Sequence, residues 1–145
     1  MARIIFELPA SFGFCTELQV YISHVNQGGH LDNAQLLSLV SEARVRFFRS
    51  LGYTEGNVQG LATVVGDMLA QYKSEAFHGE TLRVEMTPQD FNRYGFDLVF
   101  RMTEVSAGRE VARGKTGIVF IDRVGRKPAP IPDSVRELLL AVAAR

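Results

Sequence analysis

The sequence has little that would place it outside the cell or in a membrane. One of its 145 residues is a cysteine, Cys15, so no disulfide can form within the chain. Its first residues, MARIIFELP, lack the long apolar segment of a secretory signal peptide. No apolar run approaches the ~20 residues that are needed to cross a bilayer. These absences predict a soluble, cytoplasmic protein that has no membrane partner.

An excess of charge of one sign is also absent. Sixteen Lys and Arg side chains balance sixteen Asp and Glu side chains, which gives a formal net charge of zero. A surface that binds nucleic acid is usually strongly basic, so we expect no nucleic-acid partner. The sequence contains no His and Cys spacing typical of a metal site and no nucleotide-binding glycine motif. We therefore expect neither a metal nor a cofactor.

The composition that remains is that of an ordinary globular protein. Hydrophobic residues make up 46% of the chain and charged residues 22%, far from the signature of disorder. A chain of this length is typical of one domain, and it contains no internal repeat or linker. We therefore expect residues 1–145 to form a single domain.

Hydrophobic periodicity predicts a strand and then a long helix. Residues 14–23 alternate in character, with Leu18, Val20 and Ile22 on one side, as in a half-buried strand. After a glycine-containing turn, Asp32 or Asn33 can cap a helix. Apolar residues then recur every three or four positions, which predicts a helix over residues 33–51.

Alternation returns in the second half of the chain. It predicts strands over residues 61–76, with a possible bulge, and over 81–89, 96–105 and 110–122. Glycine-containing turns between them suggest three successive antiparallel hairpins. An amphipathic pattern predicts a last helix over residues 132–144.

Together these elements predict an α+β fold in which a curved antiparallel sheet of about five strands wraps around the long helix. The apolar face of that helix must be buried, and the sheet is the available partner. The small residues Ala112, Gly114 and Thr116 share one face of the last strand, where they would let the helix approach closely. Bare sheet edges favour pairing with a second copy, so we expect a homodimer or a tetramer built from dimers.

The turn before the helix carries a resemblance to a known family. Asn26-Gln27-Gly28-Gly29-His30-Leu31-Asp32-Asn33 resembles the D-x-x-G-H-V-N-N signature of the 4-hydroxybenzoyl-CoA thioesterase-like acyl-CoA hydrolases. Further matching segments follow in order, and the resemblance covers about residues 14–138. They are Ser41-Glu42-Ala43-Arg44, Tyr72 with Gly79-Glu80-Thr81-Leu82, Arg113-Gly114-Lys115-Thr116, Val119-Phe120-Ile121-Asp122, Lys127-Pro128 and Ile131-Pro132.

This resemblance implies the hotdog fold and the hydrolysis of an acyl-CoA thioester to a free acid and CoA. Coenzyme A is then part of the substrate, and no other cofactor is implied. The position that usually holds a catalytic aspartate in this family is Asn26 here. Because an amide cannot take a proton from water at neutral pH, a non-catalytic acyl-CoA-binding module is the alternative. A hydratase on the same fold is a weaker third reading.

The turn also provides candidate groups for the reaction. Thioester hydrolysis needs donors for the developing oxyanion, and the N–H groups at a helix start have no helical partner. We expect the amides near His30 and Leu31 to hold the thioester carbonyl. Gly28 and Gly29 would let the substrate approach the backbone, and Asn26 would position water or the thioester. Asn33 is a further candidate for substrate binding.

Three residues are candidates for the catalytic base. They are Glu42 on the helix, His24 before the turn, and Asp32 at its end. Each has a structural alternative: Glu42 can pair with Arg46 one turn later, His24 can end a strand, and Asp32, like Asn33, can cap the helix. His30 is expected to form a hydrogen bond within the turn and so to orient the site.

The remaining candidates concern binding of the substrate. Arg126 and Lys127, and after them Arg93 and Lys115, could meet the phosphates of CoA, although isolated surface charges are usually just solvated. Tyr72 could line an acyl tunnel, but apolar and aromatic side chains are more often plain core. The same two readings apply to Leu36, Phe47 and Phe48.

Overall fold

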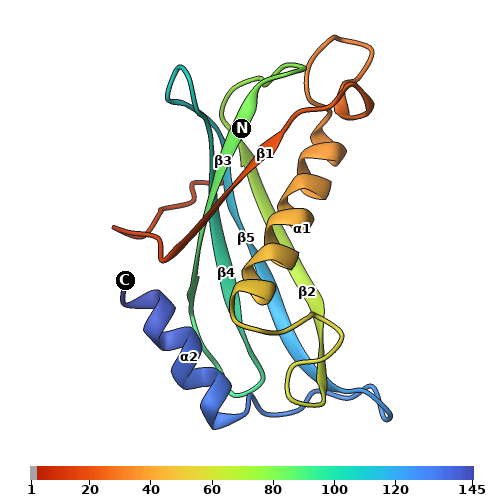
Figure 1. Cartoon of the computed structure of the whole chain (residues 1–145), viewed down its shortest axis with the longest axis vertical. Helices are drawn as coiled ribbons and strands as arrows, with labels where there is room; N and C mark the ends of the chain where they lie inside the picture. The colour runs from red at the N-terminus through yellow and green to blue at the C-terminus, as the bar shows by residue number, and fades with distance from the viewer. Residues whose placement is uncertain (1–2) are drawn as a thin grey trace.

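The computed structural model describes residues 3–145 as a curved five-stranded antiparallel sheet with two α-helices (Figure 1). The predicted α+β class is confirmed. In chain order the elements are β1 (Phe14–Gln19), the 3-10 helix η1 (Ile22–His24), α1 (Asn33–Ser50), β2 (Leu61–Tyr72), β3 (Thr81–Gln89), β4 (Gly95–Glu104), β5 (Arg109–Asp122) and α2 (Asp133–Ala143).

The long helix α1 begins where the sequence predicts, because Asp32 caps it. The Asp32 carboxylate accepts hydrogen bonds from the backbone N–H groups of Ala34 (2.9 Å) and Gln35 (3.3 Å). The helix ends at Ser50, and Gly52 follows with φ +88°, a conformation that favours glycine. Its apolar face lies in the core through Leu36, Leu39, Val40, Ala43, Phe47 and Phe48.

The strand order is β1-β3-β4-β5-β2, which differs from the predicted succession of three hairpins. The β3–β4 and β4–β5 hairpins are confirmed. The predicted hairpin between β2 and β3 is wrong, because β2 pairs with β5 and places Tyr72 opposite Ala112. The connection over residues 73–80 instead crosses the sheet end, where the Leu31 N–H donates to the Ala76 carbonyl (2.7 Å).

The first strand is shorter than the sequence predicts. It ends at Gln19, because the Tyr21 N–H donates to Nδ1 of His24 (3.0 Å) and the His24 N–H donates to the Tyr21 carbonyl (2.9 Å). These two bonds turn the chain into η1. Ile22 was expected on the same buried face as Leu18, but it is 70% exposed.

Gly114 lies against the backbone of the neighbouring strand β2, and this close approach is why the position needs a glycine. The backbone carbonyl of Leu69 in β2 lies where a side chain at position 114 would begin. The predicted role of this glycine in helix approach is therefore wrong. The predicted bulge in β2 is confirmed, since the register with β5 shifts between Val65 and Asp67.

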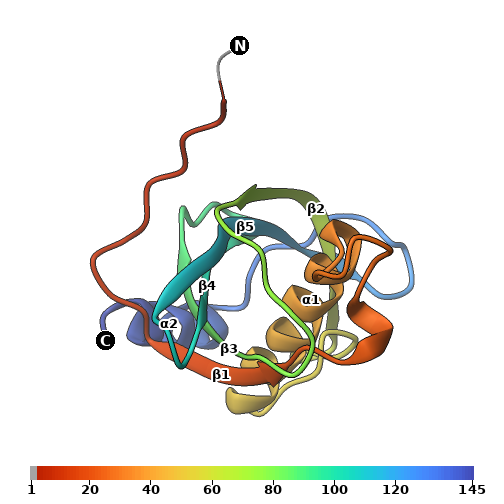
Figure 2. The same cartoon turned by 90° about the horizontal axis from the view of Figure 1, so that it is seen from above.

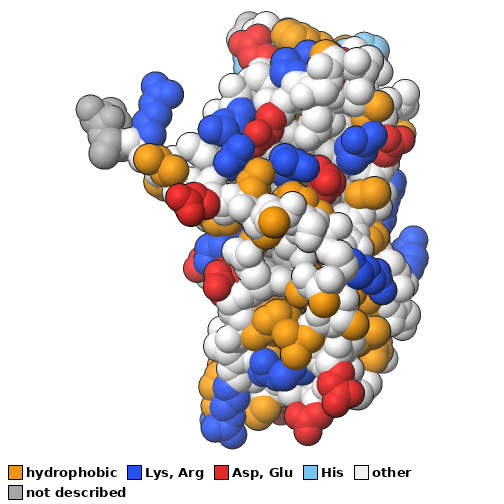
Figure 3. All heavy atoms as spheres, turned by 90° about the vertical axis from the view of Figure 1, so that its left-hand side faces the viewer, with side chains coloured by type: hydrophobic (Ala, Val, Ile, Leu, Met, Phe, Trp, Pro, Cys, Tyr) orange, Lys and Arg blue, Asp and Glu red, His pale blue; other side chains and the backbone are white. Residues whose placement is uncertain are grey.

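The sheet curves around α1, and α2 lies on its other side (Figure 2). Residues 3–13 form an extended N-terminal segment that leaves the body of the molecule (Figure 2), and its outer part protrudes from the surface in Figure 3. Side chains of the sheet hold this segment: Gln71 donates to the Ile4 carbonyl (2.6 Å) and Arg113 donates to the Phe6 carbonyl (3.1 Å). No helix in the described part of the chain is long and apolar enough to cross a membrane.

The cap of α1 gives a first testable prediction. Replacing Asp32 with alanine leaves the Ala34 and Gln35 N–H groups without their acceptor, so we expect the free energy of unfolding to fall by about 1 kcal/mol. Asp32→Asn keeps an acceptor oxygen and should lose less. Urea denaturation of both variants measures the difference, and equal losses would contradict the capping role.

Candidate active site

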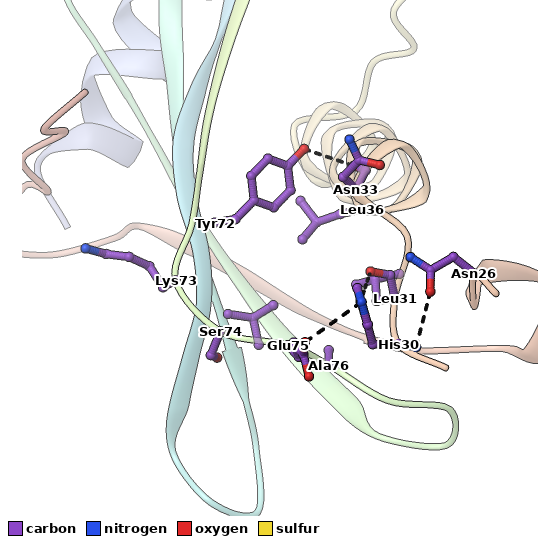
Figure 4. Close-up of a pocket in the computed structure, with 11 residues that line it drawn as sticks. Asn26, His30, Leu31, Asn33, Leu36, Tyr72, Lys73, Ser74, Glu75 and Ala76 are labelled. Atoms are coloured by element: carbon purple, nitrogen blue, oxygen red, sulfur yellow. Dashed lines mark hydrogen bonds and ion pairs between the residues drawn. The ribbon is translucent and has the colours of Figure 1, made fainter. Parts of the chain in front are cut away.

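Two cavities lie on different sides of α1, and they divide the predicted site residues between them. The first, of about 400 Å³, is the turn cavity, and Figure 4 shows its lining. The second, of about 670 Å³, lies between β1 and α1, and we call it the helix-side cavity. The turn cavity brings together Asn26, His30, Leu31, Asn33, Tyr72 and Glu75.

Asn26 holds the turn together through its side-chain oxygen. Its Oδ1 accepts hydrogen bonds from the backbone N–H groups of Gly28 (3.0 Å) and His30 (3.4 Å), and its carbonyl accepts from Gly29 (3.0 Å). Gly29 has φ +86°, which favours glycine. A side chain at Gly28 would begin 3.3 Å from Asn26 Oδ1 and 3.4 Å from His30 Nε2, so glycine avoids a tight contact here. Neither Gly28 nor Gly29 is in the lining of the turn cavity.

The backbone donors at the start of α1 differ from those expected. The Leu31 N–H is taken by the Ala76 carbonyl, and the His30 N–H points to Asn26 Oδ1. The expectation that these two amides are free is therefore wrong. Asn33 is the first residue of α1, and no acceptor within residues 3–145 takes its N–H. The positive end of the helix dipole thus offers one unpaired donor on the turn cavity.

Tyr72 closes the cavity beside this donor. Its hydroxyl donates to the Asn33 carbonyl (3.0 Å), and the two residues face each other in Figure 4. Partial burial, together with the nearby Asp32 carboxylate, raises the pKa of the Tyr72 hydroxyl. The hydroxyl therefore stays protonated at neutral pH and continues to donate. Tyr72, which was expected to line an acyl tunnel or to belong to the core, lies in the lining of the turn cavity.

His30 presents one ring nitrogen to the cavity. Its Nδ1 lies 3.2 Å from the Leu31 carbonyl oxygen, and its Nε2 lies 3.9 Å from the carboxylate of Glu75. The Glu75 side chain is 61% exposed. Glu75 was not among the predicted site residues, because its sequence neighbourhood contains no motif that marks it.

Glu42 and His24 line the helix-side cavity, away from Asn26 and His30. The Glu42 carboxylate accepts from Arg46 Nε (3.0 Å), which is the ion pair that the helical spacing allowed. Arg46 also donates to the Thr16 hydroxyl and to the Glu17 carbonyl, both at 2.9 Å. The structure thus separates two of the predicted bases from the turn.

Arg126 and Lys127 lie far from the turn cavity within one chain. They follow Asp122, which pairs with Leu61 at the beginning of β2, whereas Tyr72 stands at the end of β2. Twelve residues of extended strand separate these ends by roughly 35 Å. The other two predicted cationic contacts, Arg93 and Lys115, are not in the lining of the turn cavity either. Arg93 lies over the Tyr94 ring, 5.3 Å from its centroid. Lys115 is paired with Asp97 at 2.9 Å, which raises the pKa of its ammonium group.

No three His, Cys, Asp or Glu side chains in residues 3–145 come together as possible metal ligands. The cavity instead combines an unpaired backbone donor, a histidine and a carboxylate. A donor for a negatively charged oxygen beside groups that accept protons is the equipment of acyl transfer to water. The fold is that of the hotdog class of proteins.

Comparison with known proteins gives the family. Residues 20–139 match the model of the thioesterase-like superfamily, and the chain belongs to this family of acyl-CoA hydrolases. A 1,4-dihydroxy-2-naphthoyl-CoA hydrolase from Synechococcus sp. (strain RCC307) is 31% identical over 88 residues, which span 61% of this chain and 66% of that protein.

Solved structures have the same fold. A 1,4-dihydroxy-2-naphthoyl-CoA thioesterase from Synechocystis aligns with a TM-score of 0.80 at 23% identity, covering 88% of this chain and 95% of that chain. A thioesterase from Thermus thermophilus, crystallised with coenzyme A and zinc, aligns with a TM-score of 0.81 at 25% identity, covering 94% of this chain and 99% of that chain. The predicted hotdog architecture is confirmed.

The Asn26 turn gives a second testable prediction. Asn26→Ala removes the side-chain acceptor of two backbone N–H groups, so we expect the free energy of unfolding to fall by about 1 kcal/mol. Asn26→Asp keeps an oxygen in that place and should cost less. Thermal or urea unfolding measures both, and an alanine variant as stable as the native protein would show that the turn does not depend on this side chain.

Proposed function

We propose that this protein hydrolyses an acyl-CoA thioester in the turn cavity, with the N–H of Asn33 holding the developing oxyanion. The unpaired Asn33 N–H on the cavity is the observation that carries the proposal. Attack by water turns the thioester carbonyl oxygen into an oxyanion, and a fixed donor stabilises that charge more than the neutral carbonyl. The positive end of α1 adds to this stabilisation.

The neighbouring groups support the same assignment. Gly28 places no side chain against Asn26 and His30, so these two residues keep their positions in the cavity lining. Tyr72 fixes the position of Asn33 through its carbonyl, so the donor is held in place before substrate binds. Asn26 is occupied as an acceptor, which leaves its amide N–H groups as further possible donors to substrate or water.

We propose that the acyl group enters along the apolar part of the turn cavity, beside Leu31, Leu36 and Val111. The relatives named for 1,4-dihydroxy-2-naphthoyl-CoA suggest that aromatic acyl groups belong in the first substrate panel, with short, medium and long aliphatic ones beside them. A free-thiol assay on purified protein tests this, and release of CoA from at least one member is the expected result.

We also propose that the working form is a homodimer joined at the free edge of β2. This strand is twelve residues long, ends the sheet and exposes Val65, so it presents unpaired backbone groups to a partner. Antiparallel pairing about a two-fold axis would set the beginning of one β2 beside the end of the other. The Arg126 and Lys127 of a second copy would then approach this turn cavity and its CoA phosphates.

A binding module that does not cleave its ligand is the second candidate function. It is favoured by Asn26, whose amide cannot take a proton from water. Calorimetry with CoA, run beside the free-thiol assay, separates the two functions. Binding without turnover of any acyl-CoA would support the module.

The oxyanion donor gives a third testable prediction. Proline is well tolerated as the first residue of a helix, and Asp32, the residue before it, already has the extended conformation that precedes proline (φ −66°, ψ 142°). Asn33→Pro therefore removes the N–H while keeping α1. We expect kcat to fall by about 10²-fold to 10³-fold.

Asn33→Ala is the matched control. It removes the side chain but keeps the backbone N–H, so we expect kcat to stay within about threefold of the native value. Circular dichroism and unfolding curves confirm that α1 persists in both variants. If the proline variant keeps the native kcat, the oxyanion lies elsewhere.

The dimer gives a fourth testable prediction. Light scattering after size exclusion should give twice the 16.1 kDa mass of one chain, or a multiple of that dimer. Val65→Lys puts a charge on the proposed interface, and we expect it to shift the protein toward monomer. Arg49→Lys, at an exposed position of α1, is the control and should keep the native mass. A native protein that is monomeric at micromolar concentration would contradict the proposed interface.

A further inference from the structure

The turn cavity contains a carboxylate that neither the family signature nor the sequence pattern assigns. It belongs to Glu75, in the connection between β2 and β3, and it lies 3.9 Å from His30 Nε2 (Figure 4). The connection is held beside the turn by the bond from the Leu31 N–H to the Ala76 carbonyl. Glu75 therefore offers a carboxylate base in the cavity, which the amide of Asn26 cannot be.

The hydrogen bond of the other ring nitrogen decides what His30 offers to the cavity. A carbonyl oxygen only accepts, so the 3.2 Å contact with the Leu31 carbonyl requires the proton of the neutral imidazole to be on Nδ1. Nε2 then carries a lone pair that faces the Glu75 carboxylate. Nε2 and the carboxylate are then both acceptors, so they cannot hydrogen-bond to each other directly, and 3.9 Å separates them.

We propose, resting on the thioesterase function above, that His30 and Glu75 hold the attacking water between them and that Glu75 is the general base. A water oxygen at ~2.8 Å from each acceptor spans this gap and donates one hydrogen to Nε2 and one to the carboxylate. Its lone pairs are then free to attack the thioester carbon. Glu75 replaces the aspartate that the family signature has at position 26.

The reaction step balances without any other reactant. The water oxygen forms a bond to the thioester carbon, the carbonyl electron pair moves to the oxygen at the Asn33 N–H, and Glu75 takes the proton. The oxyanion then re-forms the carbonyl, the carbon–sulfur bond breaks, and the CoA thiolate leaves. The proton on Glu75 returns to that thiolate, so the products are a carboxylic acid and CoA thiol.

One other charged side chain lines the cavity, that of Lys73. The Lys73 side chain points away from His30 and Glu75 in Figure 4. His30 and Glu75 are therefore the proton-accepting groups that would face the proposed water. The 61% exposure of Glu75 also means that its replacement should disturb packing little.

The test is the steady-state kinetics of Glu75→Gln against the acyl-CoA that the native protein turns over fastest. We expect kcat to fall by about 10²-fold or more with KM within about threefold, because glutamine keeps the size of the side chain but cannot take the proton. Glu75→Asp should restore part of the rate.

Controls separate this inference from the function on which it rests. Glu137→Gln, at an exposed position of α2, should keep the native rate, and both glutamine variants should bind CoA with native affinity by calorimetry. If the native protein turns over and Glu75→Gln keeps the native kcat, the role of Glu75 is overturned while the thioesterase function stands. If the native protein turns over no acyl-CoA, both are overturned.

Discussion

The candidate site depends on the way the start of α1 is fixed against the sheet. The Leu31 N–H bonds to the Ala76 carbonyl and the Asp32 carboxylate caps the next turn, so the Asn33 N–H remains as the unpaired donor. The same Leu31 bond holds the chain around Glu75 beside His30. The bond between Leu31 and Ala76 therefore helps to position both the proposed oxyanion donor, at Asn33, and the proposed proton acceptors, His30 and Glu75.

Much of the fold could be predicted because its signals are local. Helix and strand periods, the Asp32 cap and the bulge in β2 are properties of neighbouring residues, and the boundaries of β3 agree with the prediction. Strand order is not local. Nothing near residues 73–80 shows that β2 passes β3 to pair with β5, since that choice depends on how the sheet encloses α1. Ile22 was misassigned because the Tyr21 and His24 bonds end the alternation of the strand.

The site could be predicted only where it is continuous in sequence. The turn from Asn26 to Asn33 is one segment, and four of its residues, Asn26, His30, Leu31 and Asn33, line one cavity, whereas Gly28 and Gly29 are not in its lining. Glu75 contacts His30 across 45 positions of chain, so no spacing could reveal it. The prediction of Glu42 as a base near the turn is not supported, although Glu42 is close to the turn in sequence. Its position on α1 directs the side chain to the helix-side cavity, where Arg46 pairs with it. The identity of the unpaired backbone N–H group, that of Asn33, likewise depends on which acceptors the His30 and Leu31 N–H groups find in the folded chain, and the glycine motif does not reveal it.

A crystal structure with a CoA thioether ketone, which keeps the carbonyl but cannot be hydrolysed, tests the central claim most directly. We predict the carbonyl oxygen at ~2.7–3.1 Å from the Asn33 nitrogen, as an oxyanion donor requires, and an ordered water between His30 and Glu75 facing the carbonyl carbon. A carbonyl found in the helix-side cavity beside Glu42, or turned away from the start of α1, would contradict the account.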